Sequence, residues 1–246
     1  MTRIALLSDI HGNVAALDAA LADIRRDAPD LVAFLGDYVL NGPRPREVVD
    51  RVRELEAQGA FVIQGNTDIA AADLDLSAAF PWFDEVPHVN VVAAEWAHEA
   101  LGEERLDWLR RLPAERRVTV DDTLVLFAHA SPGSQTQGMA AEMDAASVVE
   151  RLARTDARIV CVGHTHGADV RDLGWKQVVN PGSCGYAFDG DPGAAWALLD
   201  IDGDEVQATL RRTAYDTRPV SDELSERGLA GDVYRAATVR TGRFVR

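Results

Sequence analysis

The chain lacks several features that mark secreted and membrane-bound proteins. Only two of its 246 residues are cysteines, and one of them, Cys161, lies in an apolar run expected to be a buried strand. A disulfide with Cys184 therefore has little support, and we expect reduced thiols. No apolar targeting segment follows Met1, and no stretch of about 18 apolar residues occurs. We expect a cytoplasmic protein that does not associate with membranes.

Basic residues are also scarce. The chain has 25 Lys and Arg residues against 40 Asp and Glu residues, a formal net charge of −15. Duplex DNA and other long polyanions require a basic face, so this charge opposes binding to them. It does not oppose a small phosphorylated substrate, because bound divalent cations would bring positive charge to the pocket. Monomer and homo-oligomer both remain open.

Neither a Pro-, Gly- or Ser-rich linker nor an internal repeat divides the chain, and 47% of its residues are hydrophobic. This length and composition are sufficient for a large core, so we expect one domain over residues 1–246. Its core would occupy about residues 1–216. The residues after about Thr217 are polar and weakly patterned, which predicts a peripheral helix or a loose tail.

Five short runs are continuously apolar and are bounded by polar residues or glycine, a pattern typical of strands buried on both faces. They cover residues 4–7, 31–35, 61–63, 124–128 and 159–162. Helical spacing predicts helices after Asn13, from Pro45, near residues 145–153, and once or twice within residues 96–112. Later residues predict a hairpin over 170–179 and strands over 195–201 and 206–211. We expect a second sheet packed on the first, with helices outside.

Each of the five apolar runs ends at residues that can bind a metal. They are Asp9 and His11, Asp37, Asn66, His129, and His164 with His166. Ligands collect beyond the carboxyl ends of strands in open α/β sheets, so these side chains are expected to converge.

Taken singly, most of these residues have an ordinary structural alternative. Asp9 could cap a turn, Asp37 and Asn66 could serve turns, and His129 could be a structural histidine. The pair His164 and His166 is the most specific, because two histidines separated by one residue can face two adjacent ions. The combination predicts a dinuclear metal site.

At this point the chain resembles the calcineurin-like metallophosphoesterases, specifically their small bacterial and archaeal branch. The resembling segments are Asp9-Ile10-His11-Gly12-Asn13, Gly36-Asp37, Gly65-Asn66-x-Asp68, His129, Gly163-His164-Thr165-His166 and Asn180-Pro181-Gly182-Ser183. They span residues 4 to about 200. The resemblance implies an α/β fold, a four-layer αββα sandwich of two mixed sheets flanked by helices, with the metals at the sheet edge.

The resemblance also implies how the ligands divide between two metals. Asp9, His11, Asp37 and His166 would hold one ion, and Asp37, Asn66, His129 and His164 would hold the other. A hydroxide bridging the ions would be the nucleophile, with Asp37, Asn66 and His129 positioning it and the phosphate. A mixture of Asp, His and Asn accepts Mn²⁺, Fe, Zn²⁺, Co²⁺ or Ni²⁺, and we favour Mn²⁺.

Two departures from the family pattern concern the substrate. Thr67 stands where many members have a histidine that is thought to protonate the leaving oxygen. A positioned general acid contributes about 10²–10⁴-fold, so its absence should hurt alkyl phosphomonoesters most. Asn41 stands where protein Ser/Thr phosphatases have a phosphate-binding arginine, and we expect Arg44 and Arg46 to be solvated at a helix start.

Three more residues are candidates for a place beside the substrate. Asn13 could touch a phosphate oxygen or the nucleophile, and it could equally be a helix N-cap. His88 or His98 could replace the missing acid, although a surface or structural position is favoured for both.

The sequence therefore predicts a metal-dependent phosphodiesterase that hydrolyses small phosphodiesters or nucleotides. The alternatives are a dinucleoside polyphosphate hydrolase, which nothing in these residues distinguishes, and a Ser/Thr-type phosphatase, which Asn41 disfavours. A rival from another class is a non-catalytic partner-binding protein on the same fold, as in a retromer subunit that resembles this family. All seven metal-binding residues are present, which favours an enzyme.

Overall fold

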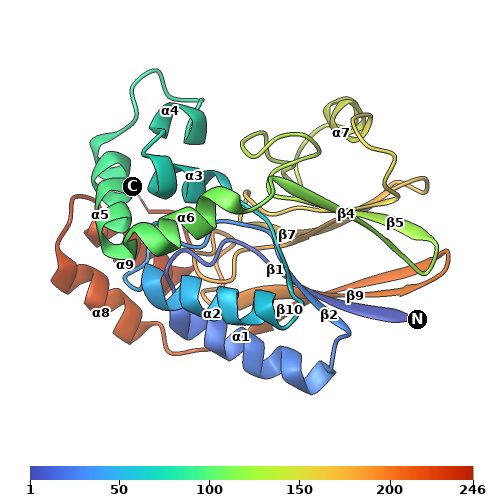
Figure 1. Ribbon diagram of the computed structural model, residues 1–246, viewed down its shortest axis with the longest axis horizontal. Coiled ribbons are helices and arrows are strands. Elements are labelled where there is room, and N and C mark those ends of the chain that lie inside the picture. Colours follow the sequence, from blue (N-terminus) through green and yellow to red (C-terminus); the bar gives the residue numbers. More distant parts are fainter. Residues whose placement is uncertain (246) are drawn as a thin grey trace.

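A computed structural model describes residues 1–245, and its centre is a pair of packed five-stranded sheets (Figure 1). The first sheet has the order β10-β9-β1-β2-β3 and the second the order β4-β5-β6-β8-β7. The strands of the first sheet are β1 (Thr2–Leu7), β2 (Leu31–Phe34), β3 (Phe61–Val62), β9 (Ala194–Asp202) and β10 (Glu205–Thr213). Those of the second are β4 (Glu115–Val120), β5 (Thr123–Ala128), β6 (Ile159–Cys161), β7 (Ala168–Asp172) and β8 (Gln177–Pro181).

Both sheets are mixed. In the first sheet β1, β2 and β3 are parallel, and β9 runs antiparallel to β1. In the second sheet β5, β6 and β8 are parallel, while β4 and β7 pair antiparallel at the two edges. The five predicted apolar runs and the hairpin are strands in the structure. The sequence grouped the hairpin and the last two strands in a second sheet, and this prediction is wrong for β9 and β10. They complete the first sheet, because β9 pairs with β1 and β10 with β9, whereas β5 and β6 join the hairpin in the second.

The side chains between the sheets form a continuous apolar layer, because alternate residues of each strand face inward. The layer includes Leu6 and Ile4 from β1, Phe127 from β5, Ile159 from β6 and Leu199 from β9, and all are fully buried. Residues of the opposite parity, such as Ala5 and Leu7, face the helices on the outside. Burial on both faces explains why these strands are apolar throughout.

Helices cover the outer faces of both sheets. The helices are α1 (Val14–Asp27), α2 (Pro45–Ala57), α3 (Asn66–Asp73), α4 (Leu76–Ala79), α5 (His88–Leu101), α6 (Glu103–Arg111), α7 (Ala145–Leu152), α8 (Arg218–Arg227) and α9 (Asp232–Thr241). Helices α1 and α2 cover the first sheet and α7 covers the second, which gives the expected αββα order (Figure 1). The predicted fold class is confirmed.

Several elements were not predicted from the sequence. Helix α5 starts at His88, eight residues before the predicted start, and Gly102 separates it from α6. Helices α3 and α4 and the edge strand β4 had no predicted counterpart. Where the sequence predicted a peripheral helix or a loose tail, α8 and α9 pack against each other and against Tyr186.

The structure also describes the two cysteines and the apolar character of the helices. Cys161 and Cys184 are both buried and unpaired with each other. Within residues 1–245, none of the helices combines the length and the apolar character that crossing a membrane requires.

The layer between the sheets should dominate stability. Phe127 is fully buried there and packs edge-on against Phe61, with 5.9 Å between ring centroids. We expect Phe127→Ala to lower the free energy of unfolding by about 3–5 kcal/mol, measured by urea denaturation. Val149→Ala on α7, where the side chain is 47% exposed, should change it by less than about 0.5 kcal/mol. Equal losses for the two variants would contradict this account of the core.

Candidate metal centre

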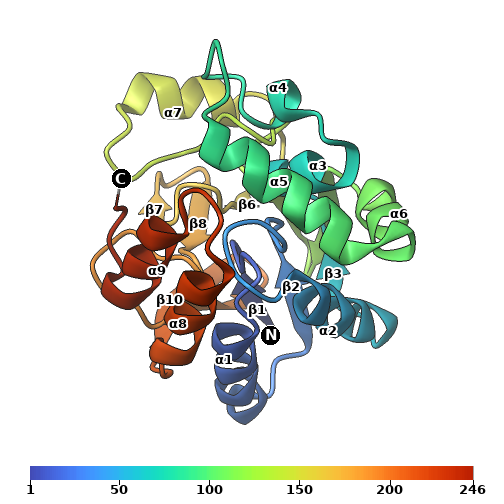
Figure 2. The ribbon, with the colours of Figure 1, turned by 90° about the vertical axis from the view of Figure 1, so that its left-hand side faces the viewer.

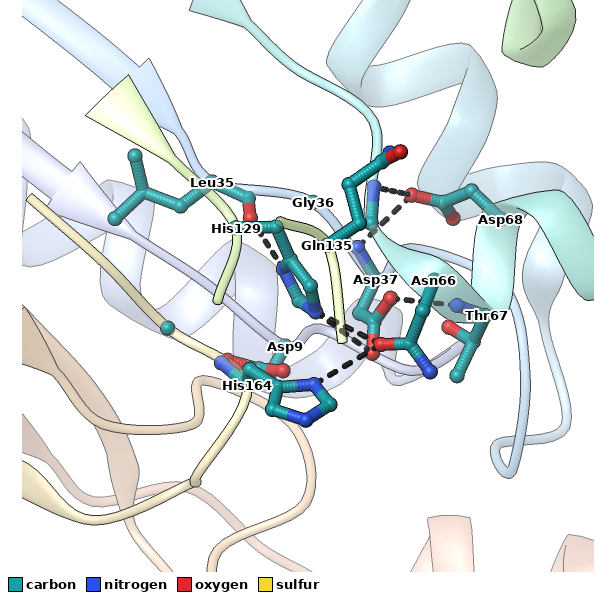
Figure 3. Close-up of polar contacts among 12 residues, drawn as sticks. Asp9, Leu35, Gly36, Asp37, Asn66, Thr67, Asp68, His129, Gln135 and His164 are labelled. Carbon is teal, nitrogen blue, oxygen red and sulfur yellow. Dashed lines mark hydrogen bonds and ion pairs between the residues drawn. The ribbon is translucent and has the colours of Figure 1, made fainter. Parts of the chain in front are cut away.

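The structure brings all seven predicted ligands to one edge of the sandwich. Asp9 and His11 follow β1, Asp37 follows β2, and Asn66 begins α3 just after β3. His129 follows β5 in the second sheet, and His164 and His166 follow β6. Both sheets therefore contribute side chains, and Figure 3 shows Asp9, Asp37, Asn66, His129 and His164 pointing toward one another.

Asp9, His11 and His166 form the first group that could hold a metal ion. His166 Nε2 lies 3.3 Å from Asp9 Oδ1 and 3.2 Å from His11 Nε2. All three side chains are buried.

Asp37, His129 and His164 form the second group. His129 Nε2 lies 3.4 Å from Asp37 Oδ2. The side-chain oxygen of Asn66 lies 3.0 Å from both His129 Nε2 and His164 Nδ1, so it points into the same space (Figure 3).

One oxygen atom connects the two groups. Asp37 Oδ2 lies 3.4 Å from His129 Nε2 in the second group and 3.8 Å from His11 Nε2 in the first. The other oxygen, Oδ1, accepts a hydrogen bond from the backbone N–H of Thr67 at 2.9 Å. This hydrogen bond fixes the carboxylate of Asp37, so that Oδ2 faces both groups.

Backbone carbonyls orient three of the imidazoles. Nδ1 of His129 lies 2.7 Å from the carbonyl oxygen of Leu35, and Nδ1 of His11 lies 3.1 Å from that of Leu40. Nδ1 of His166 bonds to the carbonyl of Tyr186 in the same way. A carbonyl only accepts, so each Nδ1 must carry the proton, and the neutral ring then has its lone pair on Nε2. This arrangement is typical of histidines that bind metals.

Asp9 has one oxygen that faces only imidazoles. Its Oδ1 is buried, makes no hydrogen bond within residues 1–245 and lies 3.3 Å from His166 Nε2, while its Oδ2 accepts the backbone N–H of His164 at 3.0 Å. Such a buried carboxylate oxygen is costly unless a positive charge, from a protonated imidazole or a metal ion, neutralises it. The donor set of two carboxylates, four imidazoles and one amide suits divalent transition metals, so these residues fit two metal ions.

The protonation of the histidines differs sharply in the metal-free protein. Burial lowers the pKa of His11 and that of His164, each to about 4. Burial also opposes charge on His129, but attraction to Asp37 outweighs it and raises the pKa of His129 to about 9. The pKa of His166 is likewise raised, because Asp9 outweighs the effect of burial.

Asp68 holds the backbone around Asp37. Its carboxylate accepts hydrogen bonds from the backbone N–H groups of Asp37 at 2.9 Å, Tyr38 at 2.8 Å and Gly65 at 2.9 Å. Burial and then repulsion by Asp37 raise its pKa to about 7. Space is so restricted that a Cβ at Gly65 would lie 2.1 Å from Asp37 Oδ1, which explains the glycine.

Of the three residues predicted to lie beside the substrate, two line the cavity and one does not. Asn41 and Thr67 line the cavity above the metal groups, although the Thr67 hydroxyl is buried and has no partner within residues 1–245. Asn13 does not line the cavity. Its oxygen caps α1 by accepting from Ala16 N, and its amide donates to Gly185 O and Tyr215. The structure thus gives Asn13 the capping role.

The possible substitutes for the missing acid and arginine do not reach the site. His98 bonds to the carbonyl oxygen of Ala71 at 2.8 Å, His88 is exposed, and neither lines the cavity. Arg44 pairs with Glu223, and Arg46 bonds to the carbonyl of Ala100. Both arginines lie outside the cavity, as expected for a solvated helix start.

The cavity has a volume of about 640 Å³, and sequence reasoning missed most of its walls. They come from residues 80–90, from Tyr186 and Phe188, and from α9 and the residues after it. The aromatic run Phe80-Pro81-Trp82-Phe83 was the one available signal, since exposed aromatic clusters are unusual in a loop. Nothing in the sequence indicated that Arg235 would line the cavity.

A family model for the calcineurin-like phosphoesterase superfamily domain matches residues 2–204. The chain belongs to this superfamily. Among solved structures it is similar to a metallophosphoesterase from Sphaerobacter thermophilus, with 30% identity, a TM-score of 0.76, and coverage of 98% of this chain and 99% of that one. A hypothetical protein from Pyrococcus horikoshii, PH1004, has the same fold, with 22% identity, a TM-score of 0.86 and the same coverage.

Among curated proteins, this calcineurin-like phosphoesterase is similar to the uncharacterised protein MJ0912 of Methanocaldococcus jannaschii. The two are 25% identical over 236 residues, which cover 90% of this chain and 91% of the relative. Membership supports a metal-dependent phosphoric ester hydrolase, and the two candidate metal groups agree with it.

Metal binding should release protons near neutral pH. His129, with a pKa of about 9, is protonated there and must lose that proton to bind a metal, and the raised pKa of His166 acts in the same direction. Affinity for Mn²⁺ should therefore rise from pH 6 to pH 9, by about tenfold per pH unit for each proton released. Competition with a chelating dye would measure this, and His88→Ala should keep the same slope. An affinity independent of pH would contradict the assignment.

Asp68 should matter for metal binding without being a ligand. In Asp68→Asn one accepting oxygen becomes an NH₂ group that faces backbone N–H groups, which should release the segment around Asp37. We expect a loss of about 10–100-fold in Mn²⁺ affinity, the range found when a group that orients a ligand is removed. Asp144→Asn is the matched control, because Asp144 is the exposed N-cap of α7 and Asn caps equally well. Unchanged affinity in Asp68→Asn would overturn the proposed role.

Proposed function

We propose that this calcineurin-like phosphoesterase is a two-metal phosphodiesterase that hydrolyses small phosphodiesters. The observation that carries the proposal is the position of Asp37 Oδ2, which lies within 3.8 Å of a ligand nitrogen in each metal group. A carboxylate oxygen shared by two groups of ligands suits a bridge between two ions. The buried Asp9 Oδ1 and the convergence on Asn66 Oδ1 support the same assignment.

In this proposal Asp9, His11, Asp37 and His166 hold one ion, and Asp37, Asn66, His129 and His164 hold the other. Two divalent ions, when bound, supply an activated water as nucleophile and stabilise the negative charge that develops on the phosphoryl oxygens. The protein fixes the ligands through the Leu35, Leu40 and Tyr186 carbonyls and through Asp68. Asp37, Asn66 and His129 would position the phosphate and the nucleophile.

The preference for diesters rests on the lack of a positioned acid. Four of the six histidines lie in the two metal groups, and the other two do not line the cavity. At position 67 a buried threonine hydroxyl replaces the usual histidine. A threonine hydroxyl is far too weak an acid to protonate a leaving oxygen near neutral pH. Poor leaving groups, such as those of alkyl phosphomonoesters, should therefore react slowly.

Mn²⁺ is the metal that we propose for activity, with Fe, Zn²⁺, Co²⁺ and Ni²⁺ as alternatives that the same ligands accept. The substrate is small and phosphorylated. A protein substrate is disfavoured because Asn41 replaces the arginine of Ser/Thr phosphatases, and Arg44 and Arg46 do not line the cavity.

The proposal predicts metal-dependent cleavage of bis-p-nitrophenyl phosphate that exceeds cleavage of p-nitrophenyl phosphate, measured with metal-stripped protein resupplied with Mn²⁺. Asp37→Asn should lower diester turnover by more than the roughly 10–100-fold that loss of an outer partner causes, since it removes the shared ligand itself. Asp144→Asn should behave as wild type.

Two outcomes would count against the proposal. Monoester turnover that equals or exceeds diester turnover would contradict the preference for diesters. Rapid Mn²⁺-dependent release of phosphate from an alkyl monoester such as glycerol phosphate, whose leaving group needs an acid, would mean that the interpretation of Thr67 is wrong. No metal-dependent turnover of either compound would favour the partner-binding alternative over an enzyme.

A further inference from the structure

The cavity has a polar floor and aromatic walls. The floor consists of the metal groups, and aromatic rings contact them directly on two sides. Phe188 stacks on His166, with 4.1 Å between centroids and 13° between planes. Trp82 meets His164 edge-on at 5.8 Å and is 51% exposed. Any organic group attached to a phosphate on the floor would therefore meet an aromatic ring.

The aromatic walls come from segments that are far apart in the sequence. One wall holds Phe80, Trp82 and Phe83 from the loop before α5, and the other holds Phe188 with Phe244, 5.0 Å apart. Figure 2 shows α5 and α9, beside which these segments lie, on the same face of the molecule. The volume of about 640 Å³ is within the range of about 300–1,000 Å³ typical of small-molecule sites.

The walls carry little positive charge. Among the described residues that line the cavity, Arg235 is the one arginine or lysine. Four of its five N–H groups already donate to the protein, to Asn41, Ala230 O, Asp232 and Val89 O. One remaining N–H is a poor match for a chain of phosphates, so the cavity above the metals suits an uncharged group.

Asn90 adds a polar group to this aromatic cavity. It lies in the first turn of α5 and lines the cavity, and its side-chain amide makes no hydrogen bond to any residue within 1–245. A free amide offers a donor and an acceptor side by side. This is the pattern that pairs with the edge of a nucleobase, as in bidentate Asn–adenine contacts. A plain aryl group has no such edge.

We infer that the cavity binds a nucleobase, and that the substrate is a nucleoside phosphodiester with a single phosphate. The base stacks on the aromatic wall formed by Trp82 and its neighbours while Asn90 contacts its edge, and the phosphate lies at the metal groups. This inference rests on the proposed function and narrows it. It disfavours dinucleoside polyphosphates, because the walls have too few cations for several phosphates.

The test compares two diesters that share phosphate and leaving group, adenosine 5′-(p-nitrophenyl phosphate) and methyl p-nitrophenyl phosphate. Stacking on one aromatic residue is worth about 5- to 150-fold in affinity. We expect wild type to favour the nucleoside compound in kcat/KM by a ratio in this range. Trp82→Ala and Asn90→Leu should each lower this ratio, whereas Trp175→Ala, an equally exposed tryptophan away from the cavity, should preserve it.

Calorimetric binding to the Mn²⁺-loaded protein supplies a readout that does not depend on turnover. AMP should bind more tightly than ribose 5-phosphate and than phenyl phosphate, and Asn90→Leu should weaken AMP alone. If AMP, phenyl phosphate and ribose 5-phosphate bind equally, the base-binding inference is overturned. If AMP binds selectively but neither diester is hydrolysed with Mn²⁺, the inference stands and the proposed phosphodiesterase activity fails.

Discussion

Backbone strain at the strand ends is the constraint on which the metal centre depends. Five of the seven candidate ligands have a left-handed backbone, with φ of 55° at Asp9, 50° at His11, 61° at Asp37, 66° at His164 and 59° at His166. Each such conformation in a residue other than glycine costs about 1–3 kcal/mol. The surrounding hydrogen bonds enforce it, including His11 N to Asp37 O at 3.0 Å and Asp9 N to Gly36 O at 3.1 Å. The strain turns both members of the Asp9–His11 and His164–His166 pairs toward the same edge.

Each metal group also depends on how the two sheets pack. The first group takes Asp9 and His11 from the end of β1 in one sheet and His166 from the end of β6 in the other. The second takes Asp37 from the first sheet, and His129 and His164 from the second. Neither group exists on a single sheet, so the apolar layer between the sheets sets the relative positions of the ligands. The candidate centre is therefore complete only when both sheets are packed together.

The sequence was most informative where each signal is local. A buried strand followed by Asp, His or Asn can be recognised within about ten residues, so the ligands were found and the structure brings them together. The sheet membership of β9 and β10 was predicted wrongly, because pairing of β9 with β1 joins residues about 195 positions apart. The cavity walls were not predicted for the same reason. Trp82, Asn90 and Arg235 become neighbours of the ligands only through tertiary packing. Helix α3 was missed because its burial follows no amphipathic period.

The C-terminal helices bring an arginine close to Asn41, the position where Ser/Thr phosphatases have their phosphate-binding arginine. Arg235 reaches this position from α9, but its Nε donates to Asn41 Oδ1, and Asp232 pairs with both Arg235 and Arg227. Arg227 in turn donates to Gly42 O, so the pair of helices is tied to the loop beside His11. A guanidinium is therefore present but committed to holding the structure. In the proposed enzyme, binding of the phosphate would then be left almost entirely to the metal ions, and selection among organic groups to the aromatic walls of the cavity.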